Sequence, residues 1–299
     1  MSGLLTRTQR PVWASRPGPV LLTFKTLSLI VIVLLVLFPL LVVVSTSLST
    51  PEEVRESGGW VIWPTQVSFA AYGEILAGGV VTRATIISVG VTVVGTAVSL
   101  AATIGIAYAL SRPRLFLGRP ITLLVVLTLF FSPGMIPTYL VVQSLGLVGS
   151  LAALVVPVLV NAFNLIVLRG FFQGIPDELF EAAKIDGASE WRMLRSIALP
   201  LSKAAVAVVG LFYAVSYWNS FFNAILYLND SSLWPLQVVL RQYVLEGSPL
   251  AGSIDVATAS APNSIQMAVV VLAMLPIVCV YPFVQRHFAS GVLTGAIKS

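Results

Sequence analysis

Acidic side chains of this 299-residue chain are concentrated in one short stretch. Five of the 12 acidic residues lie between positions 177 and 190, namely Asp177, Glu178, Glu181, Asp186 and Glu190. Pro176 suits the first position of a helix, and the negative charges of Asp177 and Glu178 directly after it stabilise the positive N-terminal end of the helix dipole. Gly187 can adopt the left-handed conformation that ends a helix. The stretch therefore predicts a charged helix of about 10 residues, about 15 Å long.

The residue types of this helix are suited to binding a partner. Leu179, Ala182 and Ala183 are spaced i, i+3 and i+4, so they form one apolar face on which two small residues let another backbone approach closely. The pattern fits a docking element, and it fits equally an amphipathic helix lying on lipid headgroups. Ser189 can cap a second short helix, which we expect to stop before Pro200.

Catalytic and metal-binding chemistry finds little support in the residue types. No Gly-Lys pair occurs, so the chain has no phosphate-binding loop of the GxxxxGK[ST] kind. The single histidine, His287, rules out a two-histidine zinc site, and the single cysteine, Cys279, rules out a disulfide framework. We expect no catalytic residue, no metal site and no bound cofactor in this chain.

Composition indicates a membrane protein. Hydrophobic residues make up 57% of the chain and charged residues only 10%, whereas about 25% of the residues in a soluble domain are charged. Six apolar stretches of about 20 residues, long enough to cross a bilayer, have no Asp, Glu, Lys or Arg in their interiors. They predict an all-α membrane protein with six transmembrane helices, at 26–46, 84–110, 120–142, 150–168, 204–223 and 265–285.

The distribution of basic residues predicts the orientation. An even number of spans puts both termini on one side, and only Arg55, Arg83 and Arg241 then lie on the other, which leaves 14 of the 17 basic residues with the termini. The positive-inside rule makes the side of the termini cytoplasmic. Topology thereby explains the net charge of +5 and the sequence pI of about 9.6, and nucleic acid is not expected as a partner.

The same topology divides the chain into parts. We expect a cytoplasmic N-terminal tail at 1–25, a six-helix domain at 26–285 with a cytoplasmic loop at 173–202, and a cytoplasmic C-terminal tail at 286–299. Residues 47–83 and 224–264 are the long outer segments. In them Trp60, Trp63 and Trp234 either contact a partner protein or lie in the aromatic belt of the membrane interface.

The absence of charge in the spans bears on the energy source. Proton-coupled carriers generally need an ionisable residue inside the membrane, and these spans contain none of the four charged types. If the protein moves solute uphill, we expect another subunit to supply the energy. A stand-alone secondary carrier or channel for a small polar solute is the alternative, because backbone carbonyls can bind sodium.

The acidic stretch also carries a spaced motif. Glu181-Ala182-Ala183, then Gly187, Ile197 and Leu199-Pro200 match the pattern EAA-x3-G-x9-I-x-LP at every fixed position. In this motif, and in its spans and loop position, nearly the whole chain resembles the permease subunits of ATP-binding-cassette importers. The segments 132–139 and 217–224 make it similar to the second permease subunit of oligosaccharide importers of the maltose-type class.

The resemblance implies a type I importer transmembrane domain in a bacterial-type cytoplasmic membrane, carrying a sugar or oligosaccharide. The loop would form a coupling helix that sits in a cleft of a cytoplasmic ATPase. The coupling residues implied by position are Glu181, Ala182, Ala183, Asp186, Gly187 and Pro200. The implied partners are a second permease subunit, two cytoplasmic ATP-binding subunits or domains that hold the ATP, and an extracytoplasmic solute-binding protein.

Polar residues inside the spans are candidates for a saccharide pathway. Aromatic planes and short hydrogen-bonding groups suit the C–H faces and hydroxyls of sugars. The candidates are Tyr213, Tyr217, Trp218, Asn219 and Asn223 in the fifth span, and Asn161 and Asn164 in the fourth. A second polar stripe lies on one helical face beside Gly95 and fits either helix packing or pathway lining. Its members are Thr85, Ser88, Thr92, Thr96, Ser99 and Thr103. Pro133-Gly134 and Pro137 predict a break in the third span.

Overall fold

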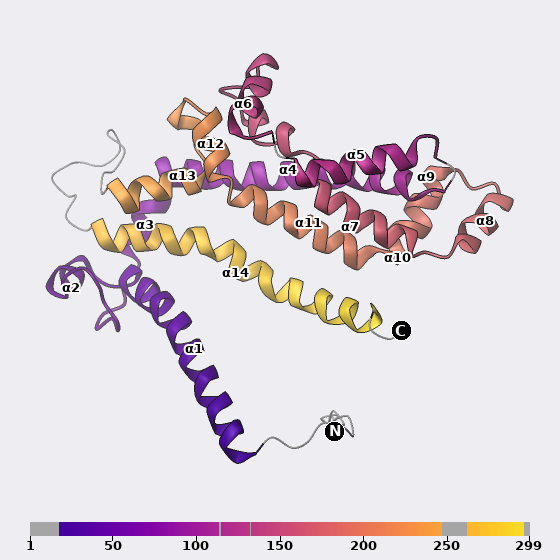
Figure 1. The fold of residues 1–299 in the computed structure, drawn as a ribbon. Helices are drawn as coiled ribbons and strands as arrows, with labels where there is room; N and C mark the ends of the chain where they lie inside the picture. Colours follow the sequence, from indigo (N-terminus) through magenta and orange to yellow (C-terminus); the bar gives the residue numbers. More distant parts are fainter. Residues whose placement is uncertain (1–17, 114, 132, 247–261, 296–299) are drawn as a thin grey trace.

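A computed structural model of the protein describes residues 18–113, 115–131, 133–246 and 262–295. Across these residues every regular element is helical (Figure 1). A helix satisfies its backbone hydrogen bonds within its own segment, as a chain in lipid must. The predicted all-α class is confirmed, and residues 1–17 and 296–299 of the predicted tails lie outside the described residues.

Three of the predicted spans are long, unbroken helices. They lie within α1 (Pro19–Ser47), α4 (Val80–Ser111) and α14 (Pro262–Gly295), and the 32 residues of α4 extend about 48 Å. The predicted tail boundaries at 25 and 286 do not coincide with helix ends, because α1 begins at Pro19 and α14 continues to Gly295. Hydrophobicity marks where a span meets lipid, whereas helical hydrogen bonding continues beyond that point.

The other three predicted spans are interrupted. The third is divided into α5 (Gly118–Phe130) and α6 (Met135–Ser144), which confirms the predicted break, and Gly134 there has a φ of +83°. The fourth begins as the short turns η1 (Leu151–Leu154) and η2 (Val156–Val158) and bends by 50° into α7 (Ala162–Gln173). The fifth is divided into α11 (Lys203–Trp218) and α12 (Phe221–Tyr227).

By length and apolar composition, three helices of the described residues can cross a membrane, or up to five if each bent pair counts as one span. Glycine, proline and asparagine at the breaks explain why six continuous helices do not form: Pro133-Gly134 separates α5 from α6, and Asn161 caps α7. The count of six spans and the side on which the termini lie stay predictions.

Short helices lie at the two ends of the bundle (Figure 1). One end holds α2 (Pro51–Glu56), α3 (Ala70–Leu76), η4 (Ser231–Leu233), α13 (Leu236–Arg241) and η5 (Gln242–Glu246). The other end holds α8 (Asp177–Ile185), α9 (Glu190–Met193), η3 (Leu194–Ala198) and α10 (Leu199–Leu201). We call these the α3 end and the α8 end.

The bundle is built around α4, which packs along both α11 and α7, while α14 packs against α11 and α1. Buried apolar residues of α4, α7, α8, α9 and α11 form one core cluster. α1 diverges from the other helices over most of its length (Figure 1), and its large apolar side chains are exposed. Exposed apolar surface of this size is suited to lipid or to another membrane subunit.

Small and hydroxyl side chains join α4 to its neighbours. Ser99 Oγ lies 2.6 Å from Tyr217 Oη, and Thr103 Oγ1 lies 2.7 Å from Tyr213 Oη, both between α4 and α11. Gly95 faces the Tyr217 ring so closely that a Cβ atom there would lie 2.9 Å from it. Helix packing therefore accounts for Ser99 and Thr103 of the predicted polar stripe.

We predict that Gly95→Ala destabilises the fold by about 1–3 kcal/mol, because the added methyl group forces the Tyr217 ring and α11 away from α4. Gly105→Ala is the matched control, since it is on the same helix and its added Cβ meets nothing within 4 Å. The midpoint of thermal unfolding in detergent measures the difference. Equal midpoints for the two variants would contradict the tight α4–α11 contact.

Candidate functional site

The predicted charged helix is α8, and its end has the geometry that Gly187 was expected to supply. Gly187 has a φ of +76°. Its N–H donates to the Lys184 carbonyl at 3.0 Å, and the Ala188 N–H donates to the Ala183 carbonyl at 2.9 Å. These two bonds form a Schellman motif, which satisfies carbonyls left free at a helix end. The chain is thereby reversed between α8 and α9.

The second short helix begins as predicted but does not end as predicted. Ser189 Oγ accepts a hydrogen bond from the Arg192 N–H and caps α9. The expectation of an end before Pro200 is wrong, because the helical run continues through the π turn η3 and α10 to Leu201. In this wide turn the Leu199 N–H bonds to the Leu194 carbonyl, five residues back. The next residue, Pro200, has no N–H to place, so the irregular turn accommodates it.

α8 is anchored by one side and exposed on the other. Phe180 is 4% exposed, and Ala183 is half-buried against the same core cluster. Glu178, Ala182 and Ile185, spaced i, i+4 and i+7, are exposed, Ile185 to 87%. We call these three residues the outer face of α8.

The predicted apolar face of α8 is thus divided between its two sides. Ala183 packs against the chain itself, whereas Ala182 is exposed and Leu179 is 45% exposed. Glu181, Asp186 and Pro200 are also exposed. The amphipathic pattern correctly indicates that one side of the helix is buried. The most buried residue on that side, however, is the large Phe180, which is not part of the predicted face of Leu179, Ala182 and Ala183.

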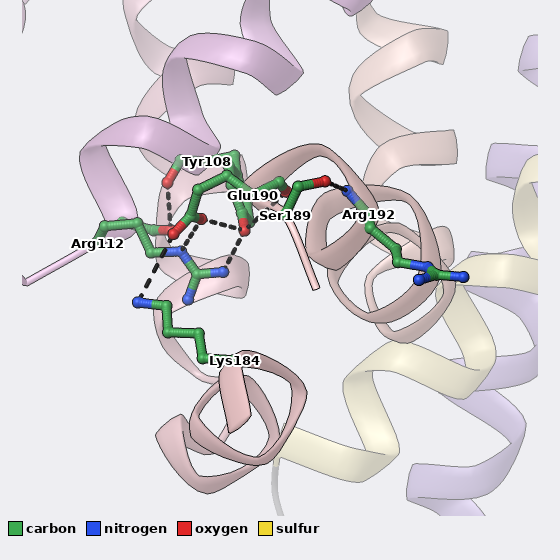
Figure 2. Close-up of polar contacts among 7 residues, drawn as sticks. Tyr108, Arg112, Lys184, Ser189, Glu190 and Arg192 are labelled. Atoms are coloured by element: carbon green, nitrogen blue, oxygen red, sulfur yellow. Dashed lines mark hydrogen bonds and ion pairs between the residues drawn. The ribbon is translucent and has the colours of Figure 1, made fainter. Parts of the chain in front are cut away.

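A polar cluster connects α8 and α9 to the end of α4 (Figure 2). Tyr108 Oη donates to Glu190 Oε2 at 2.9 Å, and Arg112 Nη2 donates to Tyr108 Oη. Arg112 Nε lies 3.8 Å from Glu190 Oε2, and Lys184 Nζ lies 3.6 Å from Glu190 Oε1. We call Tyr108, Arg112, Lys184 and Glu190 the Glu190 cluster.

Aromatic rings hold the Arg112 guanidinium from two helices. Its carbon lies 3.5 Å from the centroid of the Phe180 ring and 4.3 Å from that of Tyr108, within the range of a cation–π contact. This arrangement was not predicted from the sequence, in which Arg112 directly precedes Pro113 and marks only the end of a span. The i, i+4 spacing of Tyr108 and Arg112 marks a shared helix face, but nothing in it names α8 as the partner.

A cavity of about 490 Å³ opens beside this cluster. Its lining includes Tyr108, Arg112 and Phe180 together with the acidic residues Asp177 and Glu181. Carboxylates at such a rim are suited to basic side chains of another protein.

The predicted pathway residues separate into buried and exposed groups. Tyr213, Tyr217 and Trp218 are all 5% exposed or less. Besides the contacts with α4, the Trp218 Nε1–H donates to the Ala273 carbonyl at 2.9 Å, and Tyr213 Oη accepts the Asn161 N–H at 2.9 Å. Their polar groups bond helices of this chain to one another, and their part in a solute pathway stays a prediction.

The asparagines among these candidates lie differently. Asn164 is buried, whereas Asn161 and Asn219 are exposed and Asn223 is half-buried. The Asn161 side chain caps α7 by accepting the Asn164 N–H at 3.1 Å, and Asn219 donates to the Val215 carbonyl. Of the seven predicted residues, Asn161, Asn219 and Asn223 keep surface that is open to the outside of the chain.

Comparison with known proteins identifies the family. The sequence model described as "Binding-protein-dependent transport system inner membrane component" matches residues 101–294. The chain belongs to this family. It is a permease subunit of a binding-protein-dependent ATP-binding-cassette importer and not an enzyme, which confirms the resemblance and sets aside the stand-alone carrier.

Individual relatives agree over nearly the whole length. The chain is 46% identical to the polygalacturonan/rhamnogalacturonan transport system permease protein YtcP of Bacillus subtilis (strain 168), over 90% of this chain and 95% of that protein. It is 45% identical to protein LplC of the same organism, over 88% and 89%. A solved bacterial transporter involved in import of the acidic polysaccharide alginate matches with a TM-score of 0.84 at 30% identity, over 92% and 99%. The type I importer permease fold is confirmed.

We predict that Gly187→Ala loosens the α8–α9 turn by about 1–2 kcal/mol, the usual cost of a left-handed conformation for a residue with a Cβ atom. Hydrogen exchange of the backbone amides from 177 to 193 measures it. Gly187→Asn is the matched control, because asparagine visits this conformation more readily, and it should exchange more slowly than the alanine variant. Unchanged exchange in Gly187→Ala would show that the turn does not depend on glycine.

Proposed function

We propose that α8 is the element through which this permease subunit engages a cytoplasmic ATPase during import of an oligosaccharide. The observation that carries the proposal is the outer face of α8, which exposes Ala182 and Ile185 on a helix firmly anchored by Phe180. An exposed apolar residue flanked by acids, at the end of a helical bundle, is suited to a partner surface of apolar and basic residues.

In this proposal the residues of the motif have separate roles. Ala182 allows close approach of the ATPase, while Glu181 and Asp186 pair with its basic side chains. Ala183, Gly187 and Pro200 act within the chain. Ala183 packs α8 against the core, Gly187 forms the reversal after α8, and Pro200 belongs to the irregular stretch that leads to α11. ATP is bound by the partner and not by this chain.

We further propose a complete importer with one second permease subunit, two ATP-binding subunits or domains and an extracytoplasmic solute-binding protein. The chain crosses the membrane six times between a cytoplasmic tail at 1–25 and another at 286–299. The α8 end is then cytoplasmic and the α3 end faces outward. Exposed Trp60 and Trp63 are available there to the binding protein, whereas the Trp234 side chain is half-buried and donates to the Leu228 carbonyl.

The substrate class rests on the relatives. Both the polygalacturonan/rhamnogalacturonan permease and the alginate importer are named for polysaccharides, which supports an oligosaccharide as the transported solute. Asn161, Asn219 and Asn223 are the predicted pathway residues with surface still available to it. Amide groups of this kind hydrogen-bond hydroxyls without needing a charge in the membrane.

We predict that Ala182→Arg abolishes capture of the ATPase and ATP-dependent oligosaccharide uptake, because a long cation replaces the smallest residue of the outer face. The measurements are co-purification of the ATPase and uptake of oligogalacturonides into proteoliposomes that contain the full importer. Ala77→Arg is the matched control, since it makes the same change at an exposed alanine of the α3 end and should retain the ATPase. Normal capture and uptake by Ala182→Arg would refute the assigned role of α8.

We predict that labelling of single cysteines reports the orientation. In a Cys279→Ser background, Ser57→Cys should react with a membrane-impermeant maleimide added to intact cells, because the α3 end is outside. Arg195→Cys should react only after the cells are opened. The reverse pattern would invert the topology.

A further inference from the structure

The Glu190 cluster joins α8 to α4, a helix that is not next to α8 along the chain. α8 is connected through 174–176 to α7 and through α9 and α10 to α11, whereas α4 ends at Ser111. We propose that Arg112 and Glu190 are positioning residues that make the end of α4 move together with α8. This inference rests on the proposed function of α8 as the element that engages the ATPase.

Removing the Arg112 side chain from its contacts would cost free energy. Its side chain is 16% exposed, and its Nε atom is buried without a hydrogen-bond partner among the described residues. A buried cation is stable only where an opposite charge and suitable contacts replace water. Glu190 supplies the charge, and the rings of Phe180 and Tyr108 supply the contacts. Separation of α8 and α9 from α4 would expose Phe180 and leave Arg112 without its countercharge, Glu190 of α9.

Glu190 is the common partner within this cluster. One carboxylate oxygen accepts from Tyr108 and faces Arg112, both near the end of α4, while the other faces Lys184 of α8. Figure 2 shows the three side chains converging on this carboxylate. Without the negative charge, Arg112 and Lys184 would be two like charges brought together at the junction. Glu190 therefore holds α8, α9 and α4 in one arrangement.

α4 is well placed to carry a displacement onward. It packs along α7 and α11 through most of the bundle, and it contacts α3 and α13 near its other end. A shift of α8 that is passed to Arg112 thus reaches a single rigid helix that extends from the α8 end to the α3 end (Figure 1). The direct chain connection, by contrast, passes through the irregular η3 turn before α11.

The test is the amount of oligosaccharide transported per ATP hydrolysed by the complete importer in proteoliposomes. Glu190→Gln keeps the size of the side chain and removes its charge, and Arg112→Gln removes the cation. Each should lower this ratio about five-fold, within the range found for residues that carry coupling between sites. ATPase capture should remain near the wild-type level, because the outer face of α8 is unchanged.

Two further variants separate positioning from general damage. Tyr108→Phe removes only one hydroxyl that donates to Glu190 and should lower the ratio about two-fold. The charge exchange Arg112→Glu with Glu190→Arg restores an opposite pair and should recover part of the ratio lost in either single variant. Arg192→Gln is the matched control, since its side chain is exposed and directed away from Glu190 (Figure 2), and it should behave as wild type.

A wild-type ratio in both Glu190→Gln and Arg112→Gln would overturn the inference, and so would an exchange variant no better than the single ones. If neither single variant reaches the membrane, the ratio of Tyr108→Phe decides, and a wild-type value there overturns the inference as well. Failure of the proposed function is distinguishable, because it would appear as normal ATPase capture by Ala182→Arg whatever the Glu190 variants do.

Discussion

Close contact between α4 and α11 is the constraint on which the rest of the bundle depends. Lipid is as apolar as the side chains, so apolar burial does little to hold membrane helices together, and close packing and hydrogen bonds between helices become decisive. Gly95 lets the Tyr217 ring lie against α4, and two hydroxyl pairs beside it bind the same helices. α7 packs along α4, and α13 contacts α4 as well. At the α8 end, Arg112 directly after α4 contacts Phe180 of α8.

The sequence allowed much of this structure to be predicted, because several of its signals are local. Apolar runs located the long helices, Pro133-Gly134 located a break, and Gly187 and Ser189 located the reversal between α8 and α9. Each of these depends on residues within a few positions of one another, where backbone geometry leaves few choices. Helix ends were less accurate, since hydrogen bonding continues past the apolar residues that reveal a span.

Contacts between distant segments could not be predicted in the same way. Tyr213 and Tyr217 are residue types expected of a sugar site, but the same ring and hydroxyl serve equally well to bond two helices. Nothing in the sequence indicates that Tyr213 faces Thr103 and Tyr217 faces Ser99. Arg112 likewise precedes Pro113 in the sequence, and nothing nearby in the sequence indicates its partner. Its role emerges only when α8, far along the chain, brings Phe180 over the guanidinium.

The 86° bend between the helical run 190–201 and α11 has a mechanical consequence. Pushing a membrane helix along its own length would drag apolar side chains into water at one end and polar ones into lipid at the other, which the bilayer opposes. Because the run lies across the end of α11, a sideways displacement of the run would tilt α11 within the membrane in the proposed topology. Tilting keeps the apolar surface at the same depth, so the bend directs movement along the route that lipid resists least.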